Sequence, residues 1–134
     1  MAHPIFSDVV IMQTCAEELR HRSLPVYTKM KNLMEDKDRH FYQFANEHHR
    51  DTYIERLKDE SPNDRNDRAI RHATKWYLEH LKVLGRAALL VTDDVDCRRK
   101  AREQDGIMAV SGEYTNRFNY HLLFPSTLFH VMQY

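Results

Sequence analysis

The chain has 134 residues, of which 42% are hydrophobic and 30% are charged, with 3 Gly and 4 Pro. Lys and Arg together number 20 and Asp and Glu number 20, so the net charge is zero. This composition is typical of a single globular domain and excludes a disordered chain, a collagen-like chain and a wholly basic nucleic-acid-binding chain.

The cysteines and the apolar residues exclude two further classes of protein. Cys15 and Cys97 lie far apart and form no CxxC pair, so neither a disulfide framework nor a zinc site is indicated, and we expect free thiols in a reducing compartment. No apolar run approaches the ~20 residues that cross a bilayer, and no basic region followed by an apolar run opens the chain. We therefore expect no membrane partner.

The first half of the chain begins with a predicted buried strand. Residues 8–12 form a short apolar run rich in β-branched side chains, which favours a strand covered on both faces. Thr14, with Glu17 three residues later, is typical of a capping box and predicts a short helix to about residue 19. The other elements expected in this half are a helix over 23–34, a strand over 41–45 and a loop over 46–60.

The second half contains the best helix signal of the sequence. Ser61 is a favoured N-cap and Pro62 a favoured first helical residue. An apolar stripe that includes Ile70, Ala73 and Trp76 extends this helix to about residue 82 and predicts that these three side chains are buried against a sheet. The remaining expected elements are a strand over 87–91, a helix to about residue 103 and a strand over 107–110. Strands that alternate with helices indicate an α/β fold with a parallel sheet and helices on both faces.

Acidic residues fall where ligands bind in such sheets, near the carboxyl ends of strands. Three pairs follow a strand or open a helix: Glu17 and Glu18, Asp64 and Asp67, and Asp93 and Asp94. Carboxylate oxygens suit Mg²⁺ or Mn²⁺, and two such ions close together support hydrolysis of a phosphodiester. The pattern therefore indicates a metal site if the pairs converge.

The same residues also have ordinary structural explanations, which stay open at this stage. Asp64 is placed to complete a helix cap, Asp94 is placed to be an N-cap, and acids in first helical turns are favoured by the helix dipole alone. Basic residues alternate with the acids, and they either position the phosphates of a nucleic acid strand or form salt bridges on solvated helix faces. The basic candidates are Arg20, Arg65, Arg68 and Arg98.

Several long stretches of the sequence resemble one known family. The resemblance lies in residues 17–27, 46–56, 61–71 and 75–81 and continues in 91–94 and 100–107. Over roughly residues 5–115 the chain resembles the PIN domain of the catalytic, RNase II-family subunit of the eukaryotic RNA exosome.

This resemblance implies a fold, an activity and partners. The fold is a three-layer α/β/α arrangement with a parallel sheet. The activity is a metal-dependent endoribonuclease that hydrolyses single-stranded RNA in RNA processing and decay, with Mn²⁺ or Mg²⁺ as cofactor and two ions in the complete family site. The implied partners are RNA and the exosome core subunits, with no DNA, and the implied compartments are the nucleus, including the nucleolus, and the cytoplasm.

The resemblance also assigns roles to individual residues. It gives Glu18, Asp64 and Asp94 as the catalytic metal ligands and places Asp67 and Asp93 beside them in a supporting role. The four arginines named above would hold the RNA strand.

The sequence departs from the family in one element that matters for the site. The family's first strand, which is central in the sheet and ends in an Asp-Thr-Asn type motif, has no counterpart before residue 5. We therefore expect an N-terminally truncated PIN domain over residues 1–116 and a divergent tail over 117–134 with no assignable structure. The sheet is then completed by the tail, by a rearrangement, or not at all. The alternative function is a catalytically incomplete fragment that acts as an exosome-docking or interaction module, and cleavage by this chain is expected to be slow or absent.

Overall fold

The computed structural model describes residues 8–113 and, for the backbone alone, residues 128–132. The elements in chain order are β1 (Val9–Met12), α1 (Gln13–Arg22), α2 (Leu24–Glu35), β2 (Phe41–Phe44), α3 (Pro62–Val83), β3 (Ala87–Val91), α4 (Val95–Glu103), β4 (Ala109–Val110) and β5 (Leu128–Met132). The alternation of strands and helices predicted from the sequence is confirmed. Two bounds differ most, since α1 continues to Arg22 and β4 is only two residues long.

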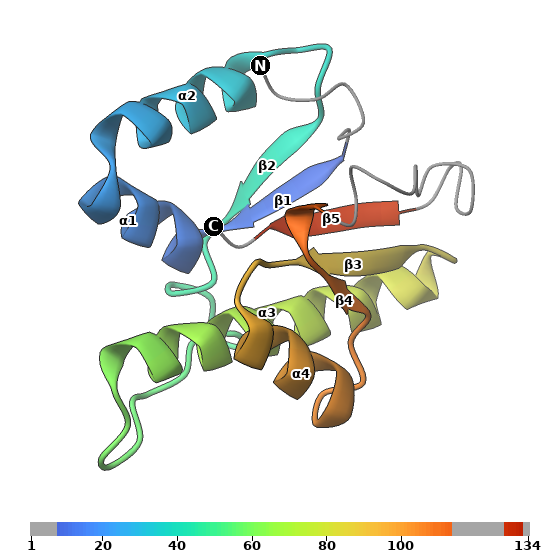
Figure 1. The fold of residues 1–134 in the computed structure, drawn as a ribbon. Coiled ribbons are helices and arrows are strands. Elements are labelled where there is room, and N and C mark those ends of the chain that lie inside the picture. The colour runs from blue at the N-terminus through green and yellow to red at the C-terminus, as the bar shows by residue number, and fades with distance from the viewer. Residues whose placement is uncertain (1–7, 114–127, 133–134) are drawn as a thin grey trace.

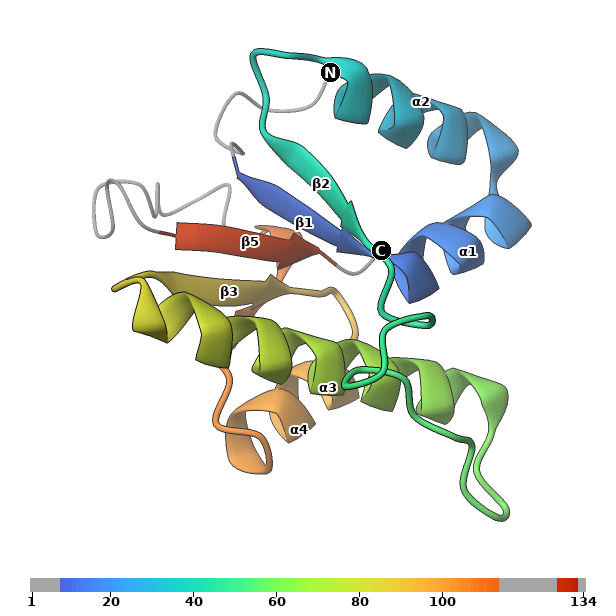
Figure 2. The ribbon, with the colours of Figure 1, turned by 180° about the vertical axis from the view of Figure 1, so that it is seen from behind.

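The strands form one parallel sheet in the order β2-β1-β5-β3-β4. Helices α1 and α2 lie to one side of the sheet, and α3 and α4 lie to the other (Figures 1 and 2). This is the expected three-layer α/β/α arrangement. No helix in the described part of the chain combines the length and apolarity needed to cross a membrane.

The core is centred on β1, which has helices on both faces. All four residues of β1 are fully buried, and Leu89 and Leu90 of β3 are buried as completely. Continuous burial of a strand requires cover on both faces, which explains why β1 is an unbroken apolar run rather than an alternating one. The centre of the sheet is therefore held chiefly by apolar burial, whereas the edge strand β2 exposes Tyr42.

Strand β5 fills the position for which the sequence offered no strand. It pairs in parallel with β1, where Val9 lies opposite His130, and with β3, where Val91 lies opposite Met132. The family's central strand was expected between these same two strands, so of the three possibilities the first holds and the tail completes the sheet (Figure 1). The ladders of β1 and β3 thereby keep a backbone partner on both sides.

The start of α1 differs from the predicted capping box. The helix begins at Gln13, one residue before Thr14, and the Thr14 backbone N–H donates to the Asn46 side-chain oxygen at 3.2 Å. The Asn46 amide in turn donates to the Thr14 hydroxyl at 2.8 Å. A residue from the loop after β2 therefore supplies the cap, because Thr14 is engaged by a distant partner rather than by Glu17.

Helix α3 follows the prediction at its start and departs from it at Trp76. The Ser61 hydroxyl accepts from the Asp64 backbone N–H at 3.0 Å, and Ile70 and Ala73 are fully buried. Trp76, however, is only partly buried. Its ring stacks on Phe44 with a centroid distance of 5.3 Å, because this turn of the helix lies beside the edge strand β2 rather than over the centre of the sheet. The predicted burial of Trp76 is therefore only partial.

Candidate functional site

A pocket of about 220 Å³ lies at the carboxyl edge of the sheet. Its walls come from the first helix after β1, from the start of α3 and from the turn after β3. The residues that line it are Glu18, Arg22, Asn63, Asp67, Thr92, Asp93 and Asp94. The structure thus brings acidic side chains from three distant parts of the sequence to one edge of the sheet, as the strand order requires.

Asp64 and Asp67 open the same helix, but their surroundings differ. Asp64 is exposed, and its carboxylate accepts from the Ser61 hydroxyl at 2.6 Å, which makes it part of the helix cap. Asp67 is half-buried and lines the acidic pocket with Glu18 and Asp94, whereas Asp64 is not among the lining residues. The structure therefore does not gather the expected set of Glu18, Asp64 and Asp94 in this pocket and offers Asp67 in place of Asp64.

The pKa shifts of two buried thiols indicate how charge is distributed around this pocket. Burial, followed by the charge of Glu18, raises the pKa of Cys15 well above its usual range, and Asp67 adds to the effect. Burial and then the charge of Asp67 raise the pKa of Cys97 to about 12, and Asp94 also contributes. The carboxylates of Glu18, Asp67 and Asp94 thus concentrate negative charge over these thiols. Neither cysteine forms a disulfide.

The two acids after β3 are held by backbone groups. Asp93 accepts from the Gly112 N–H at 2.9 Å, and Asp94 accepts from the Cys97 N–H at 2.7 Å as the N-cap of α4. Each of these hydrogen bonds uses one carboxylate oxygen, Oδ1. A carboxylate has two oxygens with several acceptor positions, so both side chains keep capacity for another ligand while their orientation is fixed.

The donor set fits a hard cation. The acidic side chains that line the pocket present carboxylate oxygens, and oxygen atoms are the ligands that Mg²⁺ and Mn²⁺ prefer. Within the described residues no three His, Cys, Asp or Glu side chains lie close enough together to form a ready-made cage. Mg²⁺ sites commonly use only one or two protein carboxylates together with water and substrate phosphates, so the pocket fits an ion that substrate helps to hold.

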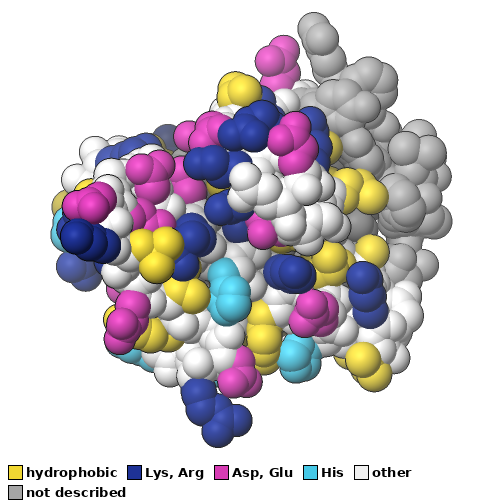
Figure 3. Space-filling model, turned by 90° about the horizontal axis from the view of Figure 1, so that it is seen from below, with side chains coloured by type: hydrophobic (Ala, Val, Ile, Leu, Met, Phe, Trp, Pro, Cys, Tyr) yellow, Lys and Arg dark blue, Asp and Glu magenta, His cyan; other side chains and the backbone are white. Residues whose placement is uncertain are grey.

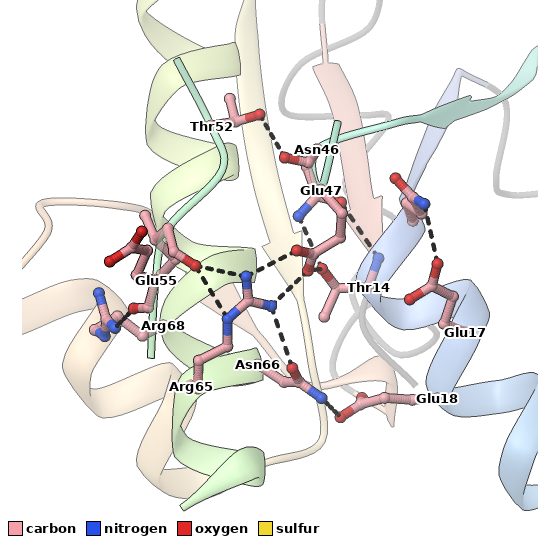
Figure 4. Close-up of polar contacts among 12 residues, drawn as sticks. Thr14, Glu17, Glu18, Asn46, Glu47, Thr52, Glu55, Arg65, Asn66 and Arg68 are labelled. Atoms are coloured by element: carbon pink, nitrogen blue, oxygen red, sulfur yellow. Dashed lines mark hydrogen bonds and ion pairs between the residues drawn. The ribbon is translucent and has the colours of Figure 1, made fainter. Parts of the chain in front are cut away.

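A larger pocket of about 460 Å³ shares Glu18 with the acidic pocket and lies beside the loop between β2 and α3. Its lining residues are Gln13, Thr14, Glu17, Glu18, His21, Glu47, His48, Tyr53, Arg65 and Asn66. Arg65 here donates to both oxygens of Glu47, at 2.7 and 2.8 Å, and to the Ile54 carbonyl (Figure 4). Burial by itself would raise the pKa of Glu47, but hydrogen bonds from Arg65 and Thr14 bring that pKa below its usual range.

Arg68 fastens the same loop one helical turn further along α3. It donates to both oxygens of Glu60, at 2.7 and 2.9 Å, and to the Glu55 carbonyl at 2.7 Å. The hydrogen bond from Arg68, with a second from the Leu57 N–H, lowers the pKa of Glu60 from 4.5 to about 2. Arg65 and Arg68 were predicted to hold RNA, and both instead hold the loop to the helix.

The other two predicted RNA-binding arginines are placed differently from each other. Arg98 donates to the Thr92 carbonyl at 2.7 Å and so stabilises the turn after β3. Arg20 is exposed on α1, and Arg22 lines the acidic pocket close to it in sequence. On the face seen from below, acidic and basic side chains are interspersed and form no continuous basic stripe (Figure 3). A phosphate contact is therefore best supported near α1.

The sequence reasoning did not single out Asn66, Glu47 or Asn46. The Asn66 amide donates to Glu18 Oε1 at 2.9 Å, and Asn46 and Glu47 meet Thr14 at the start of α1. Asn46 and Glu47 lie in a polar run without helical or strand period and Asn66 lies on a predicted helix, so the signal that they shared was the resemblance over residues 46–56 and 61–71. The side chains of such a polar run do not pack in the core, and the sequence alone does not show which residues they will contact.

Comparison with known proteins identifies relatives of the whole described region. The model of the PIN domain family matches residues 4–113. The "Exosome complex exonuclease RRP44" of Mus musculus is 44% identical over 117 residues, which cover 84% of this chain and 12% of the relative. The "Exosome complex exonuclease dis3" of Schizosaccharomyces pombe is 49% identical over 105 residues, which cover 78% of this chain and 11% of the relative. The chain thus spans about an eighth of the length of these relatives.

A solved structure agrees with this match at the level of the fold. The PIN domain of T. brucei RRP44 superposes with a TM-score of 0.73 and covers 92% of this chain and 70% of the other. Sequence identity between the two is 20%, so this likeness shows the fold alone. The family resemblance stated from the sequence is confirmed.

Proposed function

Because the chain belongs to the PIN domain family, we propose that it is a divalent-metal-dependent endoribonuclease domain that hydrolyses single-stranded RNA. The observation that carries the proposal is that Glu18, Asp67 and Asp94 line the same pocket. Relatives named as exosome exonucleases support a role beside exosome core subunits in RNA processing and decay, in the nucleus and the cytoplasm.

The proposed metal ligands are Glu18, Asp67 and Asp94, with Asp67 in the role first expected of Asp64. Asp93 stands beside them and is oriented by the Gly112 N–H. Mn²⁺ or Mg²⁺, when bound there, supplies positive charge that stabilises negative charge developing on the phosphate oxygens. The carboxylates would hold the ion, and the Asn66 side-chain amide and the Cys97 peptide N–H hold Glu18 and Asp94, so these two ligands need little rearrangement during reaction.

Arg20 and Arg22 on α1 are the proposed contacts for the RNA backbone. Arg22 lines the acidic pocket and Arg20 is exposed on the same helix, and neither is tied to the loop network that engages Arg65 and Arg68. Unpaired RNA is the proposed substrate because its backbone bends into a narrow site, which a regular duplex does not do.

Cleavage by this chain is expected to be slow. Strand β5 takes the central position in the sheet, but residues 128–134 contain no Asp or Glu. The carboxyl end of the central strand therefore contributes no acidic side chain, and fewer acidic ligands mean weaker binding of a second cation.

The test compares two isosteric substitutions three residues apart on the same helix. A circular single-stranded RNA is incubated with the chain and Mn²⁺, since only an endonuclease opens a circle. Asp67→Asn is expected to abolish opening, whereas the matched control Asp64→Asn is expected to retain it, because asparagine still accepts from Ser61. Opening that survives Asp67→Asn, or no opening by the parent chain, contradicts the proposal.

A second candidate function is binding without cleavage, as an exosome-docking or interaction module. The absence of acidic residues from 128–134 favours it, since a site short of one carboxylate is the expected state of such a module. The discriminating result is capture of exosome core subunits by a chain that leaves circular RNA intact in Mn²⁺.

A further inference from the structure

Direct contacts connect Glu18 to an ion pair beneath the loop after β2. Glu47 and Arg65 form a two-pronged pair at 2.7 and 2.8 Å, and each side chain is only 14% exposed. The Thr14 hydroxyl donates to the same carboxylate of Glu47, and the Arg65 guanidinium also holds the Ile54 carbonyl at 2.6 Å. The Glu47 carboxylate and the Ile54 carbonyl therefore fix the guanidinium in one orientation, and Thr14 in turn holds the carboxylate (Figure 4).

The next residue on α3 connects this pair to the acidic pocket. The Asn66 side-chain oxygen accepts from Arg65 at 3.5 Å, and its amide nitrogen donates to Glu18 Oε1 at 2.9 Å (Figure 4). An amide that is held at its oxygen by a cation can present only its N–H₂ group on the other side. The Arg65 contact thus selects the amide orientation that donates to Glu18.

We propose that Asn66 is a positioning residue for Glu18 and that the Glu47–Arg65 pair aims it, an inference that rests on the proposed role of Glu18 as a metal ligand. Glu18 reaches the pocket from α1 on a flexible side chain, so an unanchored carboxylate would sample several rotamers. A hydrogen bond to Oε1 fixes the carboxylate and leaves Oε2 for a cation. Carboxylate ligands are generally held by such neighbours, and their removal weakens metal binding about 10–100-fold.

The chain contains a matched control for the loop itself. Arg68 forms the same two-pronged pair with Glu60 and also holds a loop carbonyl, that of Glu55. Among the described residues, no hydrogen bond of this second pair continues to the acidic pocket. Arg65 and Arg68 thus both secure the loop, but only Arg65 is linked to Glu18.

The first experiment measures Mn²⁺ affinity of the full chain by calorimetry, without RNA. Asn66→Ala is expected to weaken Mn²⁺ binding about 10-fold, while Arg68→Ala leaves it unchanged. Glu47→Gln is expected to weaken binding about threefold in the parent background and to have no effect in the Asn66→Ala background, because coupled residues are not additive. Thermal unfolding in the absence of metal shows whether each variant is folded.

The second experiment observes the contact without any metal. In the nuclear magnetic resonance spectrum of the metal-free chain, the Asn66 side-chain N–H₂ signals are expected to shift on Glu18→Ala and to stay unchanged on Glu17→Ala. Signals that ignore Glu18→Ala overturn the inference.

The outcomes separate this inference from the proposed function. If the parent chain binds Mn²⁺ and Asn66→Ala binds it equally well, only the positioning role falls. If Arg68→Ala weakens binding as much as Asn66→Ala, the effect belongs to the loop and the positioning role also falls. If the parent chain does not bind Mn²⁺, the proposed function falls and takes the inference with it.

Discussion

The acidic pocket lies beside the loop network, which consists of the Glu47–Arg65 and Glu60–Arg68 ion pairs and reaches Glu18 through Asn66. The two regions differ in the groups that hold their carboxylates. In the network, Glu47 and Glu60 each face an arginine with both oxygens engaged. In the pocket, the carboxylates are held by single hydrogen bonds from neutral groups, as Glu18 is by Asn66 and Asp94 by a peptide N–H. Paired charges hold a fold together, whereas a carboxylate held by one hydrogen bond from a neutral group retains an oxygen that can bind a cation.

The largest effect on stability is expected from breaking the better-buried ion pair. Glu47→Ala leaves Arg65 without its anion in a site where both side chains are 14% exposed. Loss of one partner from a buried pair costs about 3 kcal/mol. Urea unfolding measures the loss, with Glu17→Ala as the control, because Glu17 is exposed and accepts only from its neighbour on the helix, Gln13. A loss no larger than that of the control would mean that the network does not hold the loop.

A smaller loss is expected where a pocket acid also has a structural role. Asp94→Ala removes the N-cap of α4, since the Cys97 N–H loses its acceptor. Loss of such a cap costs about 1 kcal/mol. Asp94→Asn is the matched variant, and it keeps the cap while removing the charge. Equal stability of the two variants in urea would contradict the capping role.

The pH dependence of stability tests the Glu60–Arg68 pair of the network, where a smaller effect is expected. The folded-state pKa of Glu60 is about 2, against 4.5 for the unfolded chain, because Arg68 stabilises the charged form. This contribution is fully present above pH 4.5 and is lost as the pH falls from 4.5 to 2. Glu60→Gln is therefore expected to flatten the fall of the urea midpoint in that window, and an unchanged slope would contradict the pairing.

The smallest effect is expected from an acid of the pocket that caps nothing. Asp67→Asn removes one of several like charges, so its unfolding free energy should stay within about 0.5 kcal/mol of the parent. The same substitution should abolish any rise of the melting temperature in Mn²⁺, since a ligand stabilises only the state that binds it. A large loss of stability without metal would instead mean that Asp67, like Glu47, holds the fold together.

The order of the elements was predictable because each local signal has a local cause. The apolar run at 8–12 became β1, and Ser61 with Pro62 began α3 as expected. Thr14 was mispredicted as half of a capping box because its partner, Asn46, lies 32 residues away. Strand β5 was missed because residues 117–134 have no hydrophobic period, and only the vacancy between β1 and β3 selects a strand there.

The candidate site was predictable as a region but not residue by residue. Residues of three acidic pairs do meet at the carboxyl edge, which follows from parallel strands. The choice between Asp64 and Asp67 depends on the phase of α3, and the Ser61 cap was the signal that Asp64 had another partner. The roles of Arg65 and Arg68 depend on carboxylates in a loop without regular structure, whose position no local pattern specifies.

The position of β5 has a consequence for how the protein is made. The strand that joins β1 to β3 pairs Val9 with His130, so the middle of the sheet closes only after the segment that follows β4 has been synthesised. Until then β1 and β3 each present an open edge of unpaired peptide groups, which other chains can pair with. Contacts between segments so distant in sequence also form slowly. Docking of β5, rather than formation of the helices, is thus the step that closes the sheet.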